Sequence, residues 1–103
     1  MDDIEGWRKK IDDIDLKLVE LLNERSQCAV EIGKIKSKLN VEIYDPRREE
    51  MVIDNARRVS TGPLTKEAVQ RLFERIVNES RRAQREVKNS QQSIETDQKL
   101  KES

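Results

Sequence analysis

Histidine is missing from the 103-residue sequence, and cysteine occurs only once, as Cys28. Without histidine the chain cannot form a Ser-His-Asp or Cys-His nucleophile system, a His-ligated zinc site or a His-ligated haem site. A lone cysteine cannot form an internal disulfide or a Cys-rich metal site, so the fold suits a reducing compartment. Any catalytic chemistry must therefore use Arg, Lys, carboxylate and amide groups.

Glycine, proline and aromatic residues are scarce, with three Gly, two Pro and one each of Trp, Tyr and Phe. The polar remainder is rich in Lys, Arg, Glu, Gln and Ser, a composition that favours helices over strands. Leu, Ile, Val and Phe together supply 26 of the 103 residues, which exceeds the roughly 20% below which disorder is expected. We therefore predict an all-α protein with one small core.

Long apolar runs and an excess of charge of one sign are missing too. No run approaches the roughly 18 apolar residues of a membrane span, and the acidic N-terminus has no apolar signal core. The 21 Lys and Arg residues balance the 21 Asp and Glu residues, which argues against a general polyanion binder. We expect a cytoplasmic protein that binds neither nucleic acid nor membrane.

One apolar stripe runs through the first 39 residues. Its eleven positions are three and four residues apart, which is the period of a coiled-coil seam, and ten of them are apolar. They are Ile4, Trp7, Ile11, Ile14, Leu18, Leu21, Arg25, Cys28, Ile32, Ile35 and Leu39. The pattern predicts one helix over about 3–39, capped by Asp2 or Asp3 and terminated by Asn40.

This helix is too long for a compact monomer. At 1.5 Å per residue it spans about 54 Å between positions 4 and 39. A compact domain of this size has a radius of gyration near 13 Å and is only roughly 35 Å across. The stripe therefore needs a second subunit to cover it, most simply in a twofold-symmetric homodimer.

A second helix is expected over 46–59. Asp45 is placed at its N-cap and Pro46 at its first helical position, where proline is favoured. The helix ends before a turn around Gly62 and Pro63.

A third helix is expected over 65–88, with Thr65 as its N-cap. Beyond it the sequence is polar, with only Ile94 and Leu100 apolar. We assign residues 1–88 to one domain and expect 89–103 to be a polar tail, as a frayed helix end or a disordered segment.

Four polar side chains lie on or beside the apolar stripes. Arg25 occupies a seam position of the first helix, and Lys36 follows eleven residues later at a rotation of only about 20°. Ser80 and Gln84 interrupt the third helix one turn apart. Because burying an unpaired charge is costly, such positions are candidates for a site. Two cations and two neutral hydrogen-bonding groups suggest a polar cavity inside a helical bundle.

The two cations also have structural interpretations. Arg25 could form a buried salt bridge with Glu79 or Glu49, or could fix the register of a coiled coil. Lys36 could be a solvated lysine at the helix edge.

The remaining candidates have structural interpretations as well. Ser80 could bond to its own helix, and Gln84 could lie at the rim of the bundle. Asp45 could be a helix cap only, and Arg48 with Glu49 could be a surface pair worth well under about 1 kcal/mol.

Five short segments, taken together, give a more specific signal. They are Arg8-Lys9-Lys10-Ile11-Asp12-Asp13-Ile14-Asp15, Leu21-Leu22-Asn23-Glu24-Arg25, Ile32-Gly33-Lys34-Ile35-Lys36, Asp45-Pro46-Arg47-Arg48-Glu49 and Ser80-Arg81-Arg82-Ala83-Gln84. In this order and spacing they resemble the all-helical class of chorismate mutase over roughly residues 4–88. The resemblance implies three-helix subunits, with a very long first helix, in an intertwined homodimer.

The resemblance also implies the reaction, the Claisen rearrangement of chorismate to prephenate on the route to phenylalanine and tyrosine. This reaction is unimolecular and pericyclic, so no nucleophile, metal or organic cofactor is expected. Acceleration would come from holding the reactive chair-like conformer and from stabilising charge as the ether C–O bond lengthens.

Residue roles follow from the same resemblance. Arg25 and Arg8 of the partner subunit would bind the two substrate carboxylates, which suit the guanidinium fork. Lys36 and Gln84 would donate to the ether oxygen from two sides.

The other implied roles concern the substrate's hydroxyl and carboxylates. Asp45 and Glu49 would position the ring hydroxyl, Arg48 would orient the carboxylate network, and Ser80 would contact a carboxylate. Four cations and two carboxylates leave an excess of two positive charges, which matches a dianionic substrate.

Three alternatives accompany this hypothesis. An isochorismate pyruvate-lyase of the same fold also uses a cation-rich helical pocket for a pericyclic reaction on a related dianion. A noncatalytic coiled-coil interaction module would fit the heptads and the charged surface. A nucleic-acid binder could use the cations of 81–88, although the zero net charge and the few aromatic residues argue against it.

Overall fold

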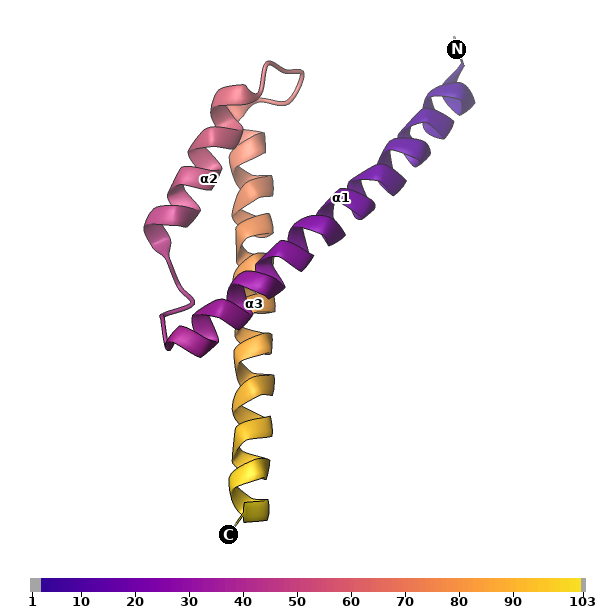
Figure 1. The fold of residues 1–103 in the computed structure, drawn as a ribbon. Coiled ribbons are helices and arrows are strands. Elements are labelled where there is room, and N and C mark those ends of the chain that lie inside the picture. The colour runs from indigo at the N-terminus through magenta and orange to yellow at the C-terminus, as the bar shows by residue number, and fades with distance from the viewer. Residues whose placement is uncertain (1–2, 103) are drawn as a thin grey trace.

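The computed structural model describes residues 3–102, with side chains for residues 3–91. This part of the chain forms three helices and no strand, which confirms the predicted all-α class (Figure 1). The helices are α1 (Ile4–Leu39), α2 (Pro46–Val59) and α3 (Lys66–Glu102).

The helix ends lie where the capping residues predict them. The Asp3 carboxylate accepts the Gly6 backbone N–H at 2.8 Å, and Asn40 ends α1 in the left-handed conformation with φ of 56°. Asparagine tolerates this conformation better than most residues. At the start of α3, the Thr65 hydroxyl accepts the Ala68 backbone N–H at 3.0 Å.

Helix α3 is longer than the sequence predicted. It continues to Glu102 instead of ending near residue 88. The reason is local: residues 89–102 contain neither glycine nor proline and are rich in Lys, Glu and Gln, which favour helix. The assignment of 1–88 to one domain stays a prediction, and Ser103 lies outside the described residues.

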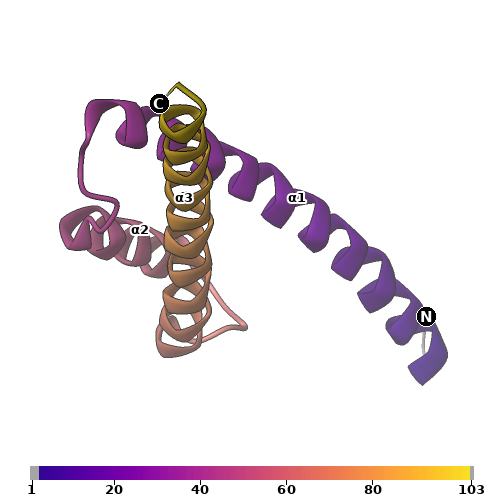
Figure 2. The same ribbon diagram turned by 90° about the horizontal axis from the view of Figure 1, so that it is seen from below.

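Helix α3 packs against both other helices. The C-terminal part of α1 crosses it, and α2 lies along its first turns, as two perpendicular views show (Figures 1 and 2). The crossing with α1 uses small residues, since Ala29 and Gly33 are the buried residues of that helix. The N-terminal half of α1 projects away from the rest of the chain.

The described chain is elongated and has little core. Its radius of gyration is 18.8 Å and its principal extents are 70, 30 and 15 Å, whereas a compact domain of this size has a radius of gyration near 13 Å. Only four apolar residues are buried within the described part, namely Ala29, Ile43, Val69 and Val77. Burial of apolar surface is the main driving force for folding, so one chain alone supplies little of it.

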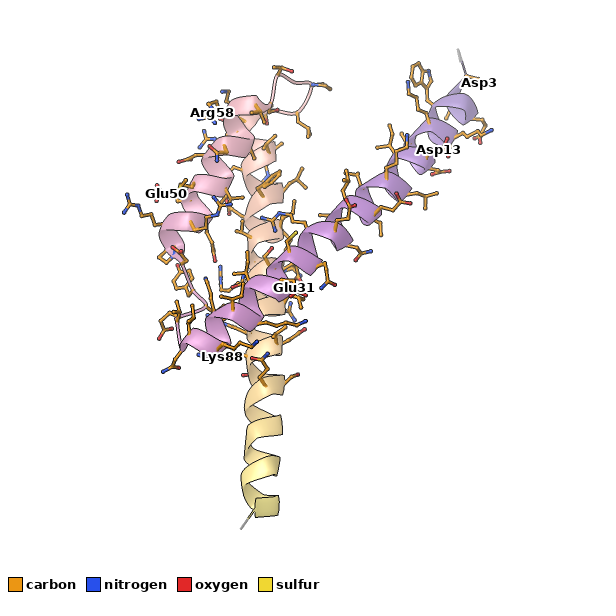
Figure 3. All side chains as sticks on the ribbon, in the orientation of Figure 1. Asp3, Asp13, Glu31, Glu50, Arg58 and Lys88 are labelled. Atoms are coloured by element: carbon orange, nitrogen blue, oxygen red, sulfur yellow. The ribbon has the colours of Figure 1, made fainter. Side chains whose placement is uncertain are left out.

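An unpaired apolar stripe covers the projecting half of α1. Its side chains extend from the helix without meeting another described element (Figure 3). They are between 46% and 68% exposed and comprise Ile4, Trp7, Ile11, Ile14, Leu18 and Leu21. The length of α1 predicts such a surface, and the homodimer that would cover it stays a prediction.

The described residues contain neither a candidate membrane span nor a candidate metal cluster. None of the helices between residues 3 and 102 combines the length and apolarity that a bilayer span requires. In the same residues, no three acidic or Cys side chains gather closely enough to hold a metal ion.

Candidate active site

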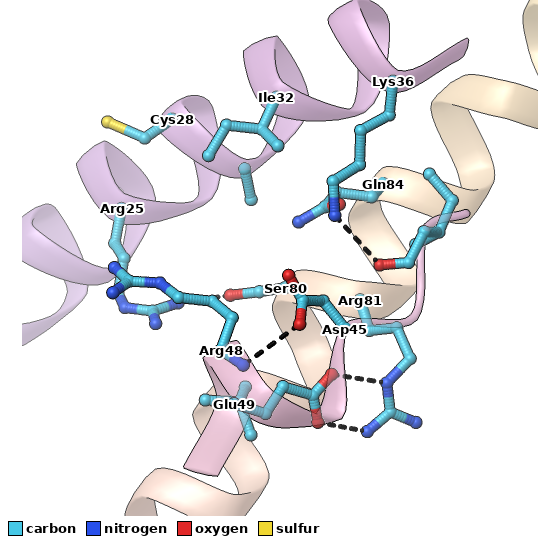
Figure 4. A pocket seen from close by; sticks show the side chains of 13 residues that line it. Arg25, Cys28, Ile32, Lys36, Asp45, Arg48, Glu49, Ser80, Arg81 and Gln84 are labelled. Carbon is cyan, nitrogen blue, oxygen red and sulfur yellow. Dashed lines mark hydrogen bonds and ion pairs between the residues drawn. The ribbon is translucent and has the colours of Figure 1, made fainter. Parts of the chain in front are cut away.

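A cavity of about 360 Å³ lies where the three helices meet (Figure 4). Seven of the eight residues predicted for the site line it, which are Arg25, Lys36, Asp45, Arg48, Glu49, Ser80 and Gln84. The fold therefore brings together side chains that lie up to 59 positions apart in the sequence.

Helix α1 supplies Arg25 and Lys36 from one face. Arg25 is half-buried, and its Nη1 atom donates to the Ser80 hydroxyl on α3. The Ser80 hydroxyl donates in turn to the Ile76 carbonyl at 3.2 Å. Arg25 thus takes neither Glu79 nor Glu49 as a hydrogen-bond partner in the described structure. The bond to Ser80 holds its guanidinium beside the cavity.

Lys36 is held by the connection between α1 and α2. Its Nζ atom donates to the Ile43 carbonyl at 3.1 Å, and Ile43 is only 6% exposed. An ammonium group has three N–H donors, so two remain for a ligand. Lys36 is therefore half-buried and anchored, and not a solvated edge lysine.

The first turn of α2 supplies Asp45, Arg48 and Glu49. The Asp45 carboxylate caps the helix by accepting the Arg48 backbone N–H at 3.1 Å, which leaves its other oxygen available. Both residues are exposed, so they lie at the mouth of the cavity. The Arg48 side chain extends toward Arg25 (Figure 4).

Glu49 does not pair with Arg48 but with Arg81 on α3. Two hydrogen bonds join the side chains, from Nε to Oε2 at 2.9 Å and from Nη2 to Oε1 at 2.8 Å. Glu49 is 20% exposed and Arg81 is 23% exposed. The hydrogen bonds to Glu49 raise the pKa of Arg81 above its ordinary value, against the opposite effect of burial.

Arg81 also lines the cavity, although the site roles implied by the family resemblance do not include it. Its guanidinium carbon lies 4.9 Å from the centre of the Tyr44 ring. A usable signal was present, since Val77, Arg81 and Gln84 follow one another at helical spacing and so share a face. The partner Glu49 is 32 positions away on another helix, which no helical periodicity reveals.

Gln84 lies at the point where α1 and α3 come closest. A Cβ atom built on Gly33 would lie 2.9 Å from the Gln84 Cα and 3.2 Å from its Cβ. The Gln84 Oε1 atom is buried and has no hydrogen-bond partner in the described structure. Buried polar atoms are almost always paired, so this oxygen is an exception, and the Gln84 side chain also lines the cavity.

Arg8 is the one predicted site residue that a single chain does not bring to the cavity. It lies on the projecting half of α1 and pairs with Glu5 at 2.9 Å, with 67% of its side chain exposed. Even without it, four cations and two carboxylates line the cavity, which leaves an excess of two positive charges.

Comparisons with known proteins agree with this arrangement. The sequence model of chorismate mutase type II matches residues 7–85. A bifunctional chorismate mutase/prephenate dehydratase from Pseudomonas aeruginosa is 35% identical over 82 residues, which cover 75% of this chain and 22% of that protein. A chorismate mutase from Methanocaldococcus jannaschii is 42% identical over 52 residues, covering 50% of this chain and 52% of that one. The chain thus spans about a fifth of the bifunctional relative's length.

Solved structures show the same fold. Chorismate mutase (form II) from Thermus thermophilus superposes with a TM-score of 0.77 at 30% identity, over 80% of this chain and 93% of that chain. Chorismate mutase from Helicobacter pylori, solved in complex with prephenate, superposes with a TM-score of 0.74 at 27% identity. The superposition covers 82% of this chain and 91% of that chain. Because the family model matches residues 7–85 of this chain and the all-helical fold is shared, the chain belongs to the chorismate mutase type II family.

Proposed function

We propose that the chain is an isomerase that converts chorismate to prephenate, with the catalytic domain in residues 1–88. The excess of two positive charges in the cavity carries the proposal, because the substrate is a dianion. The relative from Helicobacter pylori that was solved with prephenate supports the same ligand class. A role in the synthesis of phenylalanine and tyrosine, in the cytoplasm, belongs to this proposal.

The rearrangement requires positioning and charge stabilisation only. It is unimolecular. An acceleration of about 10⁶-fold requires the site to lower the activation free energy by roughly 8 kcal/mol. Holding the flexible substrate in its chair-like conformer supplies part of this, and donors aimed at the ether oxygen supply the rest.

Lys36 and Gln84 are the proposed donors to the ether oxygen. Lys36 keeps two N–H donors after its bond to Ile43. The Gln84 side chain lines the cavity, and its amide NH₂ group carries two N–H donors. Both groups come from the closely packed crossing of α1 and α3, which limits their freedom.

The other predicted residues take binding roles. Arg25 binds a substrate carboxylate, and Arg48 orients the second from the cavity mouth. Asp45 and Glu49 position the ring hydroxyl, whose single proton is donated to the Glu49 carboxylate. Ser80 supports Arg25, because its hydroxyl proton already goes to Ile76, and its predicted direct contact with a carboxylate would require that proton to turn.

A homodimer completes the proposed site. The exposed stripe on α1 offers an apolar surface to a second copy, and this half of the helix also carries Arg8. A twofold dimer makes the same contact twice, so each cavity would receive Arg8 of the partner subunit, and its positive excess would rise from two to three.

The proposed reaction is tested by adding chorismate to the purified chain and following chorismate loss and prephenate formation together. We expect stoichiometric conversion that heat-denatured protein does not give. A parallel incubation with isochorismate, assayed for salicylate, tests the lyase alternative. A folded dimer that converts no chorismate would contradict the proposal.

The shared site is tested by mixing subunits. Arg8→Ala and Arg25→Ala proteins are each expected to be nearly inactive, whereas co-refolding them should restore about one quarter of the wild-type activity. Random pairing makes half the molecules heterodimers, each with one intact site. The matched control mixes Arg25→Ala with the Arg8→Ala/Arg25→Ala double variant, in which no intact site can form. Recovery no greater than in this control would rule out the shared site.

A further inference from the structure

We infer that Arg81 is a positioning residue for substrate recognition, which acts by orienting the Glu49 carboxylate toward the substrate's ring hydroxyl. The inference rests on the proposed function. It assigns a role to a residue that the sequence motifs left unassigned, and it concerns selectivity for a hydroxylated ring.

The hydrogen-bond geometry leaves Glu49 able to accept from a ligand. Arg81 donates one N–H to each carboxylate oxygen, at 2.9 and 2.8 Å. A carboxylate has about four acceptor positions, so one remains on each oxygen. A bidentate pair fixes the carboxylate plane as well as its position, which aims the remaining lone pairs in a defined direction. Because Glu49 lines the cavity, this direction is available to a bound molecule.

Charge gives a second reason for the pair. An unneutralised Glu49 would repel a dianion in the same cavity. Arg81 cancels that charge without removing the acceptor oxygens. Without Arg81 the positive excess in the cavity would fall from two to one.

Tyr44 holds the guanidinium from a third element. The Arg81 carbon lies 4.9 Å from the Tyr44 ring centre, within the range of a cation–π contact. Tyr44 belongs to the connection that precedes α2, and Glu49 belongs to the first turn of that helix. Arg81 therefore ties the start of α2 to α3 on both sides of the cap residue Asp45.

The test compares chorismate with an analogue in which hydrogen replaces the ring hydroxyl. A site built to bond a hydroxyl rejects the analogue that lacks it. We expect Arg81→Met to lower kcat/KM for both dianions, because the unneutralised Glu49 then repels them, and to lower that for chorismate by about 10-fold more than that for the analogue. Arg81→Lys keeps the charge but loses the fork, so it should retain an intermediate preference for chorismate.

The matched control is Arg82→Met. Arg82 is the next residue of α3, is exposed, and contacts Glu79 on the surface at 3.4 Å. It should leave both kcat/KM values within about twofold of the wild type. A further experiment places Arg81→Met in a Glu49→Ala background. If Arg81 acts through Glu49, the added change should lower kcat/KM for chorismate by less than about threefold.

The outcomes separate the inference from the function on which it rests. A wild type that turns over no chorismate would overturn both. If the wild type is active but Arg81→Met lowers kcat/KM for both substrates by the same factor, only the inference is overturned. Arg81 would then be structural or would bind a carboxylate directly. The same holds if Arg81→Met is as costly in the Glu49→Ala background. Circular dichroism of each variant, with Arg81→Lys as the better-tolerated change, confirms that folded proteins are compared.

Discussion

Replacing Lys36 with alanine is expected to lower kcat by about 10²- to 10³-fold, with a much smaller change in KM. Removal of one donor aimed at a charge that develops in the transition state typically has this effect on kcat. The bond from Nζ to the Ile43 carbonyl holds the ammonium in place before substrate arrives, so its stabilisation requires little reorganisation. Initial rates of prephenate formation over a range of chorismate concentrations separate kcat from KM.

The control for this variant is Lys34→Ala. Lys34 lies two residues earlier on α1, pairs with Glu31 at 3.2 Å and is 47% exposed, so it loses the same charge outside the cavity. Its kcat should stay within about twofold of the wild type. A Lys36→Ala protein with normal kcat and a raised KM would show that Lys36 only attracts the substrate, which removes its proposed contact with the ether oxygen.

The sequence predicted the parts of the site that depend on local rules. Arg25 and Lys36 share a face because eleven residues make just over three helical turns, and both line the cavity. The Asp45-Pro46 pair fixed the start of α2, and the observed cap bond to Arg48 places that turn at the cavity mouth.

The parts that the sequence could not predict depend on how separate helices meet. The pairing of Glu49 with Arg81 instead of Arg48 follows from the packing of α2 on α3. The hydrogen bond from Arg25 to Ser80 likewise requires α1 to pass α3 close to Ser80. Arg8 lies outside the cavity of a single chain, and its predicted place in a partner subunit's site would depend on how two chains meet, which the sequence of one chain does not specify.

Gly33 allows α1 to cross α3 close to Gln84. Its missing side chain lets the backbone of α1 approach that of α3, where an added Cβ would lie 2.9 Å from the Gln84 Cα and 3.2 Å from the Gln84 carbonyl oxygen. These are backbone atoms, so no rotation of a side chain relieves the overlap. Ala29 and Val30 lie four and three residues before Gly33, and Lys36 lies three residues after it. A shift of α1 at Gly33 would therefore move Lys36 relative to Gln84.

Gly33→Val is expected to lower the free energy of unfolding by about 1–3 kcal/mol, the usual cost of overpacking, and to lower kcat by up to about 10²-fold. The loss of rate follows because a misplacement of about 1 Å between catalytic groups and substrate can cost that much. Urea unfolding gives the stability, and steady-state kinetics at a denaturant-free condition where circular dichroism shows folded protein gives the rate.

Gly33→Ala decides between packing and helix propensity, because the two effects have opposite signs. Alanine in a helix interior is favoured over glycine by about 1 kcal/mol, so propensity alone predicts a more stable protein with unchanged kcat. Gly6→Ala, in the first turn of α1 and far from the crossing, measures that propensity effect separately. We expect Gly33→Ala to be less stable than Gly6→Ala and slower than the wild type, with Gly33→Val lower still in both. If both Gly33 variants instead matched the wild type in kcat, the close approach of α1 to Gln84 would have no part in placing Lys36 and Gln84 for the reaction.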